Sequence, residues 1–159
     1  MDFIELMDFS VYLKTILLPV VVTFLASWLI GFERQNVGKA AGISPHVLIA
    51  CTACCLALMQ KEFNTEFDAQ RIIAQLVTGV GFLGAGVIMK SKYSVKGLTT
   101  ATTLFASAII GLIIGSGFYE IGLTLTAVVL LFMYGRNVLR GINPFTKIKV
   151  KENETHLDE

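Results

Sequence analysis

The sequence carries little charge. Only 16% of its 159 residues are charged, the net charge is +1, and 54% of the residues are hydrophobic. Soluble domains usually carry about 25% charged residues, spread along the chain. There is no overall basic field, and neither basic–aromatic alternation nor zinc-ligand spacing indicates nucleic-acid binding. The composition argues against a soluble domain and against a nucleic-acid partner, and the length suits one compact domain in a lipid bilayer.

Cysteine is also scarce, and its placement excludes a disulfide scaffold. Cys51, Cys54 and Cys55 lie in one apolar stretch, whereas a secreted disulfide framework distributes cysteines over loops. Cys51 and Cys55 share a helix face, but two thiols without a third ligand make a weak metal site. We expect all three to be small packing residues.

The N-terminus lacks the basic region of a cleaved signal peptide. It carries Asp2, Glu5 and Asp8 instead, and no small-x-small cleavage site follows the first apolar run. That run is therefore expected to remain as a membrane anchor. Residues 1–14 mix apolar and acidic residues, which leaves open an interfacial helix, a disordered segment or an extension of the first helix.

Long charge-free runs are what the sequence does have. Residues 15–32, 40–60 and 72–89 each match the roughly 20 residues that one membrane-spanning helix needs. Residues 97–135 contain 39 residues and one charge, Glu120. At about 1.5 Å per residue, a helix of this length is about twice as long as a hydrocarbon core of about 30 Å is thick. We predict two helices with a turn at residues 115–120, and hence an all-α transmembrane bundle with about five spans.

Helix starts are predicted from capping residues. Ser44–Pro45 matches an N-cap followed by proline at the first helical position, and Asp68 is a candidate cap for the third helix. Pro19 lies inside the first run, where neighbouring helices are expected to satisfy the carbonyl that it frees.

Lysine and arginine are biased to one side of such a bundle. With five spans, ten basic residues lie on the side of the C-terminus and three on the other. The positive-inside rule then places the N-terminus outside and the C-terminus in the cytoplasm. The predicted organisation is an extracytoplasmic segment (1–14), a five-helix transmembrane domain (15–135) and a short cytoplasmic tail (136–159).

Small residues form two patterns inside the membrane. One repeats every four residues in the fourth helix and predicts close helix packing, within the bundle or between subunits; we favour packing within the bundle. Its members are Thr99, Thr103, Ser107, Gly111 and Gly115. The other lies in the third helix, where it indicates either a helix buried centrally, which we favour, or one that bends or exposes carbonyls along a polar path. It contains Gly79, Gly81, Gly84 and Gly86.

Polar residues at membrane depth are few and expensive unless partnered. Gln75 is expected to hydrogen-bond to a neighbouring helix. His46 is expected to be a satisfied structural group rather than a switch, and Glu33–Arg34 an interfacial charge pair. The candidate functional residues are Glu33, Arg34, His46, Asp68, Arg71, Gln75 and Lys96.

Ion-binding and catalytic chemistry find little support. Magnesium sites gather several oxygen ligands, yet Glu33 and Glu120 are the carboxylates in or beside the four runs and lie at opposite predicted ends. No ligand cluster is visible for magnesium or a cofactor, although a homo-oligomer is able to assemble a pathway. His46 and Cys54 are about 12 Å apart along a helix, too far for a nucleophile–base pair. We therefore expect no enzyme.

Three segments resemble the signatures of the MgtC/SapB family of bacterial membrane proteins. They are GFERQNVGKAAG at residues 31–42 followed by His46, RIIAQLVTGVGFLGAG at 71–86, and VKGLTTA at 95–101. The segments occur in family order across residues 25 to 135. The chain departs from the family at Ser44 and Pro45, where arginine and threonine are frequent, and at Lys96, where arginine is common. Longer members carry a soluble C-terminal domain that this chain is expected to lack.

The resemblance implies a multi-pass protein of the bacterial inner membrane that serves magnesium homeostasis and stress adaptation. Two hypotheses follow. The first is a homo-oligomeric membrane factor that binds and modulates another membrane protein. The alternative is a homo-oligomeric transporter or channel for magnesium or another cation, with Glu33, Gln75 and the third-helix glycines along its pathway.

Overall fold

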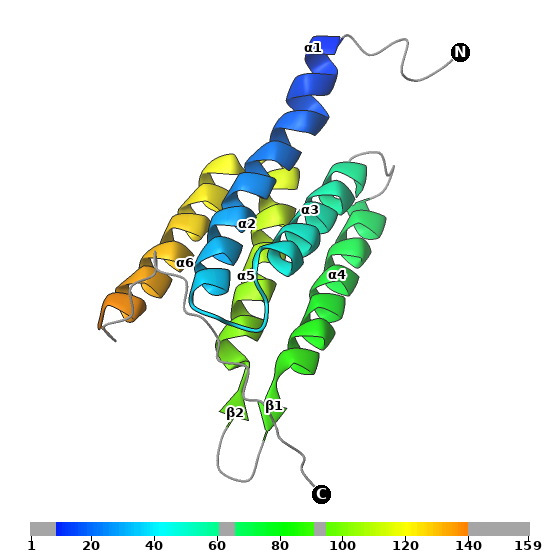
Figure 1. The fold of residues 1–159 in the computed structure, drawn as a ribbon. Coiled ribbons are helices and arrows are strands. Elements are labelled where there is room, and N and C mark those ends of the chain that lie inside the picture. Colours follow the sequence, from blue (N-terminus) through cyan, green and yellow to red (C-terminus); the bar gives the residue numbers. More distant parts are fainter. Residues whose placement is uncertain (1–8, 61–65, 91–94, 140–159) are drawn as a thin grey trace, which may run out of the picture.

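The computed structural model describes residues 9–60, 66–90 and 95–139 (Figure 1). Its helices are α1 (Phe9–Tyr12), the π-helical turn η1 (Leu13–Leu17), α2 (Leu18–Asn36), α3 (Ile43–Met59), α4 (Glu66–Val87), α5 (Leu98–Gly115) and α6 (Tyr119–Leu139). Strands β1 (Met89–Lys90) and β2 (Val95–Lys96) form a small antiparallel hairpin between α4 and α5. The predicted all-α bundle is confirmed, and the hairpin is a feature that the sequence did not indicate.

The first helical segment is continuous from residue 9 to residue 36, with η1 inside it. In η1 the Leu18 N–H donates to the carbonyl of Leu13, five residues back. Pro19 follows directly, and proline lacks the N–H that an α-helix needs there, so the wider turn accommodates its ring. Residues 9–14 thus extend the first helix. Residues 1–8 lie outside the described residues, and the extracytoplasmic placement of the segment stays a prediction.

Both predicted helix starts are wrong. Helix α3 begins at Ile43 with Gly42 as its N-cap, so Ser44 and Pro45 lie inside its first turn. Proline is tolerated there because the first four N–H groups of a helix have no partner within it. Helix α4 begins at Glu66, which puts Asp68 in the first turn rather than at the cap. The charge-free run marks the depth of hydrocarbon, and a helix continues beyond it into the polar interface.

The long run of residues 97–135 does split into two helices, as predicted. Helix α5 ends at Gly115 and α6 begins at Tyr119, so three residues make the turn. Gly117 has a φ of +102°, a left-handed conformation that glycine adopts without steric cost. Helix α6 then continues to Leu139, four residues beyond the expected end.

Helix α5 lies at the centre of the bundle and contacts α2, α3, α4 and α6. One buried apolar cluster joins three of these helices. Its members are Ala26 and Ile30 of α2, Ile110 and Ile114 of α5, and Met133 of α6. Helix α4 is peripheral, because only 11% of its apolar window is buried against 56% for α5. The interpretation of α4 as a centrally buried helix is therefore wrong.

The small residues of α5 bring it into backbone contact with α3. A Cβ at Gly111 would lie 2.0 Å from the Ala50 carbonyl oxygen, and one at Gly115 would lie 2.5 Å from that of Cys54. No larger residue fits at this distance, so these glycines permit a close helix–helix contact of the kind common in membranes. Ser107 lies one turn earlier on α5 and is fully buried.

Among the described residues, four helices are long and apolar enough to cross a membrane, namely those of residues 13–36, 70–87, 98–115 and 119–139. Helix α3 is shorter, with 17 residues, about 26 Å at 1.5 Å per residue. It packs against both α2 and α5 (Figure 1). The α2–α3 loop, the hairpin and the last turns of α6 lie together at one end of the bundle (Figure 1).

Candidate functional site

Glu33 and Arg34 form a buried ion pair at the end of α2. Both side chains are 0% exposed. Arg34 donates to the carboxylate through Nε and, over 2.6 Å, through Nη2. Asn137 of α6 donates its side-chain amide to Oε1 of the same carboxylate. We call these three residues the Glu33 cluster; it ties the last turns of α2 and α6 together.

The local sequence explains why this cluster forms. Ile30 anchors α2 in the core, and the next turn carries Glu33 and Arg34, whose side chains are fully buried. Arg34 lies in the last turn of α2, where the negative, carbonyl end of the helix dipole stabilises a positive charge. The sequence predicted a charge pair at the membrane interface, whereas the structure buries the pair completely.

One nitrogen of the Glu33 cluster has no partner. Arg34 Nη1 is buried without a hydrogen bond among the described residues. A buried donor left without an acceptor costs about 1–3 kcal/mol. The carboxylate, in contrast, accepts three hydrogen bonds, so its charge is compensated inside the chain.

His46 joins α3 to α5 at the same end of the bundle. It is completely buried; its Nδ1 lies 2.7 Å from the Gly42 carbonyl oxygen and its Nε2 lies 3.1 Å from Oγ1 of Thr103. A carbonyl only accepts, so Nδ1 carries the proton. The partner of Nε2, Oγ1 of Thr103, also donates to the Thr100 carbonyl over 3.0 Å. Both ring nitrogens therefore have partners among the described residues, and the structural role of His46 stays a prediction.

The other predicted site residues lie apart from this group. Lys96 is exposed on β2, while Arg71 and Gln75 are exposed on α4. Gln75 has no hydrogen-bond partner among the described residues, so the predicted bond to another helix is not formed among them. The side chain of Asp68 is outside the described part of the structure. Glu33 and Gln75 therefore do not converge on a common cavity.

The glycines of α4 divide into two groups. Gly84 packs on Ala101 of α5, with a Cβ position 3.6 Å from the Ala101 Cβ. Gly79, Gly81 and Gly86 have no atom within 4 Å of a Cβ placed on them. Gly84 thus packs against another helix, whereas the other three glycines face away from the described part of the chain.

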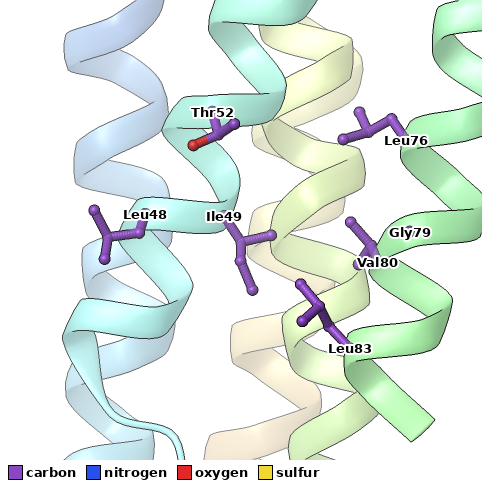
Figure 2. A pocket seen from close by; sticks show the side chains of 7 residues that line it. All are labelled: Leu48, Ile49, Thr52, Leu76, Gly79, Val80 and Leu83. Carbon is purple, nitrogen blue, oxygen red and sulfur yellow. The ribbon is translucent and has the colours of Figure 1, made fainter. Parts of the chain in front are cut away.

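A hollow of about 360 Å³ lies between α3 and α4. Figure 2 shows Ile49 of α3 and Leu76, Val80 and Leu83 of α4 pointing toward one another across it. Helices α3 and α4 touch little, because each packs instead on α5. The hollow is almost wholly apolar, and its lining residues are Leu48, Ile49, Thr52, Leu76, Gly79, Val80 and Leu83.

Comparison with known proteins identifies the family. Residues 20–142 match the model of the MgtC family. The chain belongs to the MgtC family. With its long apolar helices, this MgtC-family chain is a multi-pass membrane protein.

Curated relatives are similar over this membrane region. The MgtC-family chain is 39% identical over 115 residues to "Putative magnesium transporter YhiD" of Escherichia coli (strain K12), with 67% of this chain and 54% of the relative covered. It is 42% identical over 94 residues to Protein MgtC of Brucella abortus (strain 2308), covering 59% and 40% respectively. For Protein MgtC of Salmonella typhimurium (strain LT2) it is 37% identical over 121 residues, covering 74% and 52%.

The MgtC-family chain thus spans about half the length of the curated relatives it matches. No solved structure matches it.

Potential metal ligands are scattered over the described residues of this MgtC-family chain. No group of three or more histidine, cysteine or acidic side chains able to hold a metal ion occurs among the described residues. Magnesium requires about six oxygen ligands in near-octahedral geometry. Glu33, the carboxylate nearest the bundle interior, is already engaged by Arg34 and Asn137.

Sequence reasoning missed two members of the site. Asn137 was assigned to the tail because Arg136 marks the end of the charge-free run, yet α6 continues past it. Thr103 was assigned only to the small-residue ladder. A polar residue within reach of a predicted helix end was the available signal for Asn137, but its partner Glu33 lies 104 residues away.

Proposed function

We propose that this chain serves magnesium homeostasis and adaptation to low magnesium by binding and modulating another membrane protein. The family and the names of its relatives supply the link to magnesium. The mode of action rests mainly on the Glu33 cluster. A carboxylate that already accepts three hydrogen bonds and neutralises an arginine is a poor ligand for a passing cation.

The hollow between α3 and α4 supplies a surface for such a partner. In lipid, helices associate through close packing and interhelical hydrogen bonds rather than through a hydrophobic driving force. A hollow lined by Leu76, Val80 and Leu83 accepts aliphatic side chains from a partner's transmembrane helix, and the Thr52 hydroxyl offers one hydrogen bond. The proposal includes a bacterial inner-membrane location with the N-terminus outside, the Glu33 cluster near the cytoplasmic face, and no catalytic step.

Cation transport is the second candidate, because YhiD is named for magnesium transport. It requires several subunits, since Glu33 and Gln75 do not meet within one chain. Glu33 would also have to exchange Arg34 for the ion during each transport event.

Purified chain in liposomes with a magnesium-sensitive dye tests transport. We expect flux no greater than that of protein-free liposomes, because the described residues contain no group of three or more histidine, cysteine or acidic side chains able to hold a metal ion. The matched control is the double variant Glu33→Gln, Gln75→Leu, which should give the same trace. Saturable flux that this double variant abolishes, at an equal amount of folded protein in the liposomes, would overturn the proposal in favour of a transporter.

Filling the hollow tests partner binding. The Thr52→Trp variant should lose the ability to support growth in low magnesium in cells that depend on this chain, because the indole occupies the space of the partner's side chains. Its amount in membranes and its thermal stability in detergent should stay unchanged, since Thr52 is exposed.

Leu131→Trp is the control for the hollow. Leu131 is 77% exposed on α6, away from the hollow, and its replacement should support normal growth. Full growth of the Thr52→Trp cells would show that the hollow is not the partner surface.

A further inference from the structure

One face of α4 carries residues at heptad spacing that the described part of the chain leaves uncovered. Its residues follow one another at intervals of four, three, four and three, and each is exposed. This spacing is the heptad pattern with which two helices pack at a crossing angle of about 20°. We call these residues the α4 seam: Arg71, Gln75, Thr78, Phe82 and Ala85.

Exposure of the α4 seam to lipid is unfavourable because of Gln75. It lies five residues into the apolar span that begins at Gln70, about 8 Å along the helix axis. Thr78 satisfies its hydroxyl on its own helix, through the Ala74 carbonyl at 2.9 Å. The Gln75 amide has no partner among the described residues, and an unpaired primary amide in hydrocarbon loses the hydrogen bonds that water would give it.

We propose that the α4 seam binds the α4 seam of a second copy of this chain, giving a parallel dimer. Copies inserted with the same orientation are related by a two-fold axis along the membrane normal. Every residue then lies at the depth of its counterpart, and Gln75 meets Gln75 of the second copy. A primary amide both donates and accepts, so the two side chains satisfy each other reciprocally.

Phe82 fits the same arrangement. It is 80% exposed and follows Gln75 by one heptad, so it is a knob of the seam. In heptad packing the hole that receives it comprises residues 78, 81, 82 and 85 of the other helix. Thr78, Gly81 and Ala85 are small, and Gly81 has open space where a Cβ would be. One bulky side chain therefore meets a ring of small ones on each helix.

The α4 seam is distinct from the hollow. Gln75 and Phe82 belong to the seam, and the residues that follow them in sequence, Leu76 and Leu83, line the hollow. Successive residues lie about 100° apart around a helix, so the two surfaces face different directions. Arg71 lies at the polar end of the span, where its long side chain is able to reach water rather than face its counterpart. The rest of the seam has one amide, one large side chain and small residues in between, and so it complements itself. A polar residue at a core heptad position also favours one register and one stoichiometry, which commits the surface to a second copy rather than to an unlike partner.

Cysteine cross-linking of the full chain in bacterial membranes tests the dimer. In a background with Cys51, Cys54 and Cys55 replaced by alanine, Ala85→Cys should form a disulfide-linked dimer on oxidation. Leu83→Cys, exposed on the hollow side of α4, is the matched control and should remain monomeric. Equal cross-linking at both positions, a band with a different protein, or no dimer from folded chain would each overturn the proposal.

A second measurement separates the amide from the packing. In detergent micelles Gln75→Leu should raise the dimer dissociation constant roughly threefold to tenfold, the range for interhelical hydrogen bonds in membranes. Thr124→Leu on the exposed face of α6 should leave that constant unchanged. An unchanged constant for Gln75→Leu would overturn the role of the amide. The proposed partner binding at the hollow is unaffected by either result, since Thr52→Trp leaves the seam intact.

Discussion

Gly111→Leu is expected to abolish the close contact between α3 and α5 and to prevent stable folding of the bundle. A Cβ at this position would lie 2.0 Å from the Ala50 carbonyl oxygen, 2.8 Å from its carbon and 3.0 Å from its Cα. These are backbone atoms of a helix, which do not move without displacing all of α3. Overpacking ordinarily costs about 1–3 kcal/mol, and here the cost should exceed that range.

Thermal unfolding in mild detergent measures the effect, with size-exclusion chromatography as a check on aggregation. Gly135→Leu is the matched control, because a Cβ at Gly135 of α6 meets nothing within 4 Å. It should unfold at the temperature of the unmodified protein. A Gly111→Leu protein as stable as Gly135→Leu would mean that α3 does not approach α5 as closely as described.

A graded series sharpens the test. Gly122→Ala also places a Cβ too close to a neighbour, at 2.5 Å from Cγ1 of Ile114. That atom belongs to a flexible side chain, which moves at lower cost than a helix backbone. Gly122→Ala should therefore destabilise the protein less than Gly111→Ala does.

Glu33→Leu is expected to destabilise the bundle by about 3–5 kcal/mol, because it leaves the Arg34 guanidinium buried without a counter-charge. The Asn137 amide loses its acceptor as well, which adds to the penalty. The loss should appear as a lower unfolding temperature in detergent and less protein in the membrane. Glu120→Leu, a replacement of an exposed carboxylate on α6, should change stability little.

The double variant Glu33→Leu, Arg34→Met distinguishes a buried charge from a lost contact. Replacing both members of a buried ion pair by apolar residues is often neutral or stabilising, whereas removing one is costly. The double variant should accordingly be more stable than Glu33→Leu alone, with only Asn137 left unsatisfied. If the double variant is the less stable of the two, the pair itself stabilises the protein and the argument from desolvation is wrong.

The burial of Glu33 changes what its substitution means. An ion pair exposed at an interface contributes about 0–1 kcal/mol, so a sequence-based argument expects substitution to impair function and leave folding intact. In the enclosed Glu33 cluster the same substitution affects folding first. Loss of growth in a Glu33 variant is therefore informative only when the amount of folded protein is measured beside it.

Local composition was sufficient to predict the helical spans. Uninterrupted apolar runs require backbone hydrogen bonds to be satisfied within each segment, which in lipid means a helix. The split of residues 97–135 followed from the same argument, because no bilayer accommodates a single helix of that length. The exact starts of α3 and α4 did not follow, since helices continue through the interface where charge reappears.

The position of α4 in the bundle could not be predicted from its glycines. Small residues serve equally well to pack a central helix and to line a face that receives another protein. What decides between them is the packing of α3 and α4 on α5, which leaves Gly79, Gly81 and Gly86 open and buries Gly84.

The sequence by itself determined that this protein is a bundle of apolar helices in a membrane, because hydrophobicity and segment length act locally along the chain. Only the tertiary structure decided that Glu33 lies beside Asn137, that His46 lies beside Thr103, and that the Gln75 face is uncovered. These arrangements depend on which helix faces meet, and that choice is made by contacts between residues far apart in sequence. In this protein the backbone contact of Gly111 with Ala50 is one such choice, because it places α5 at the centre and leaves α4 at the edge.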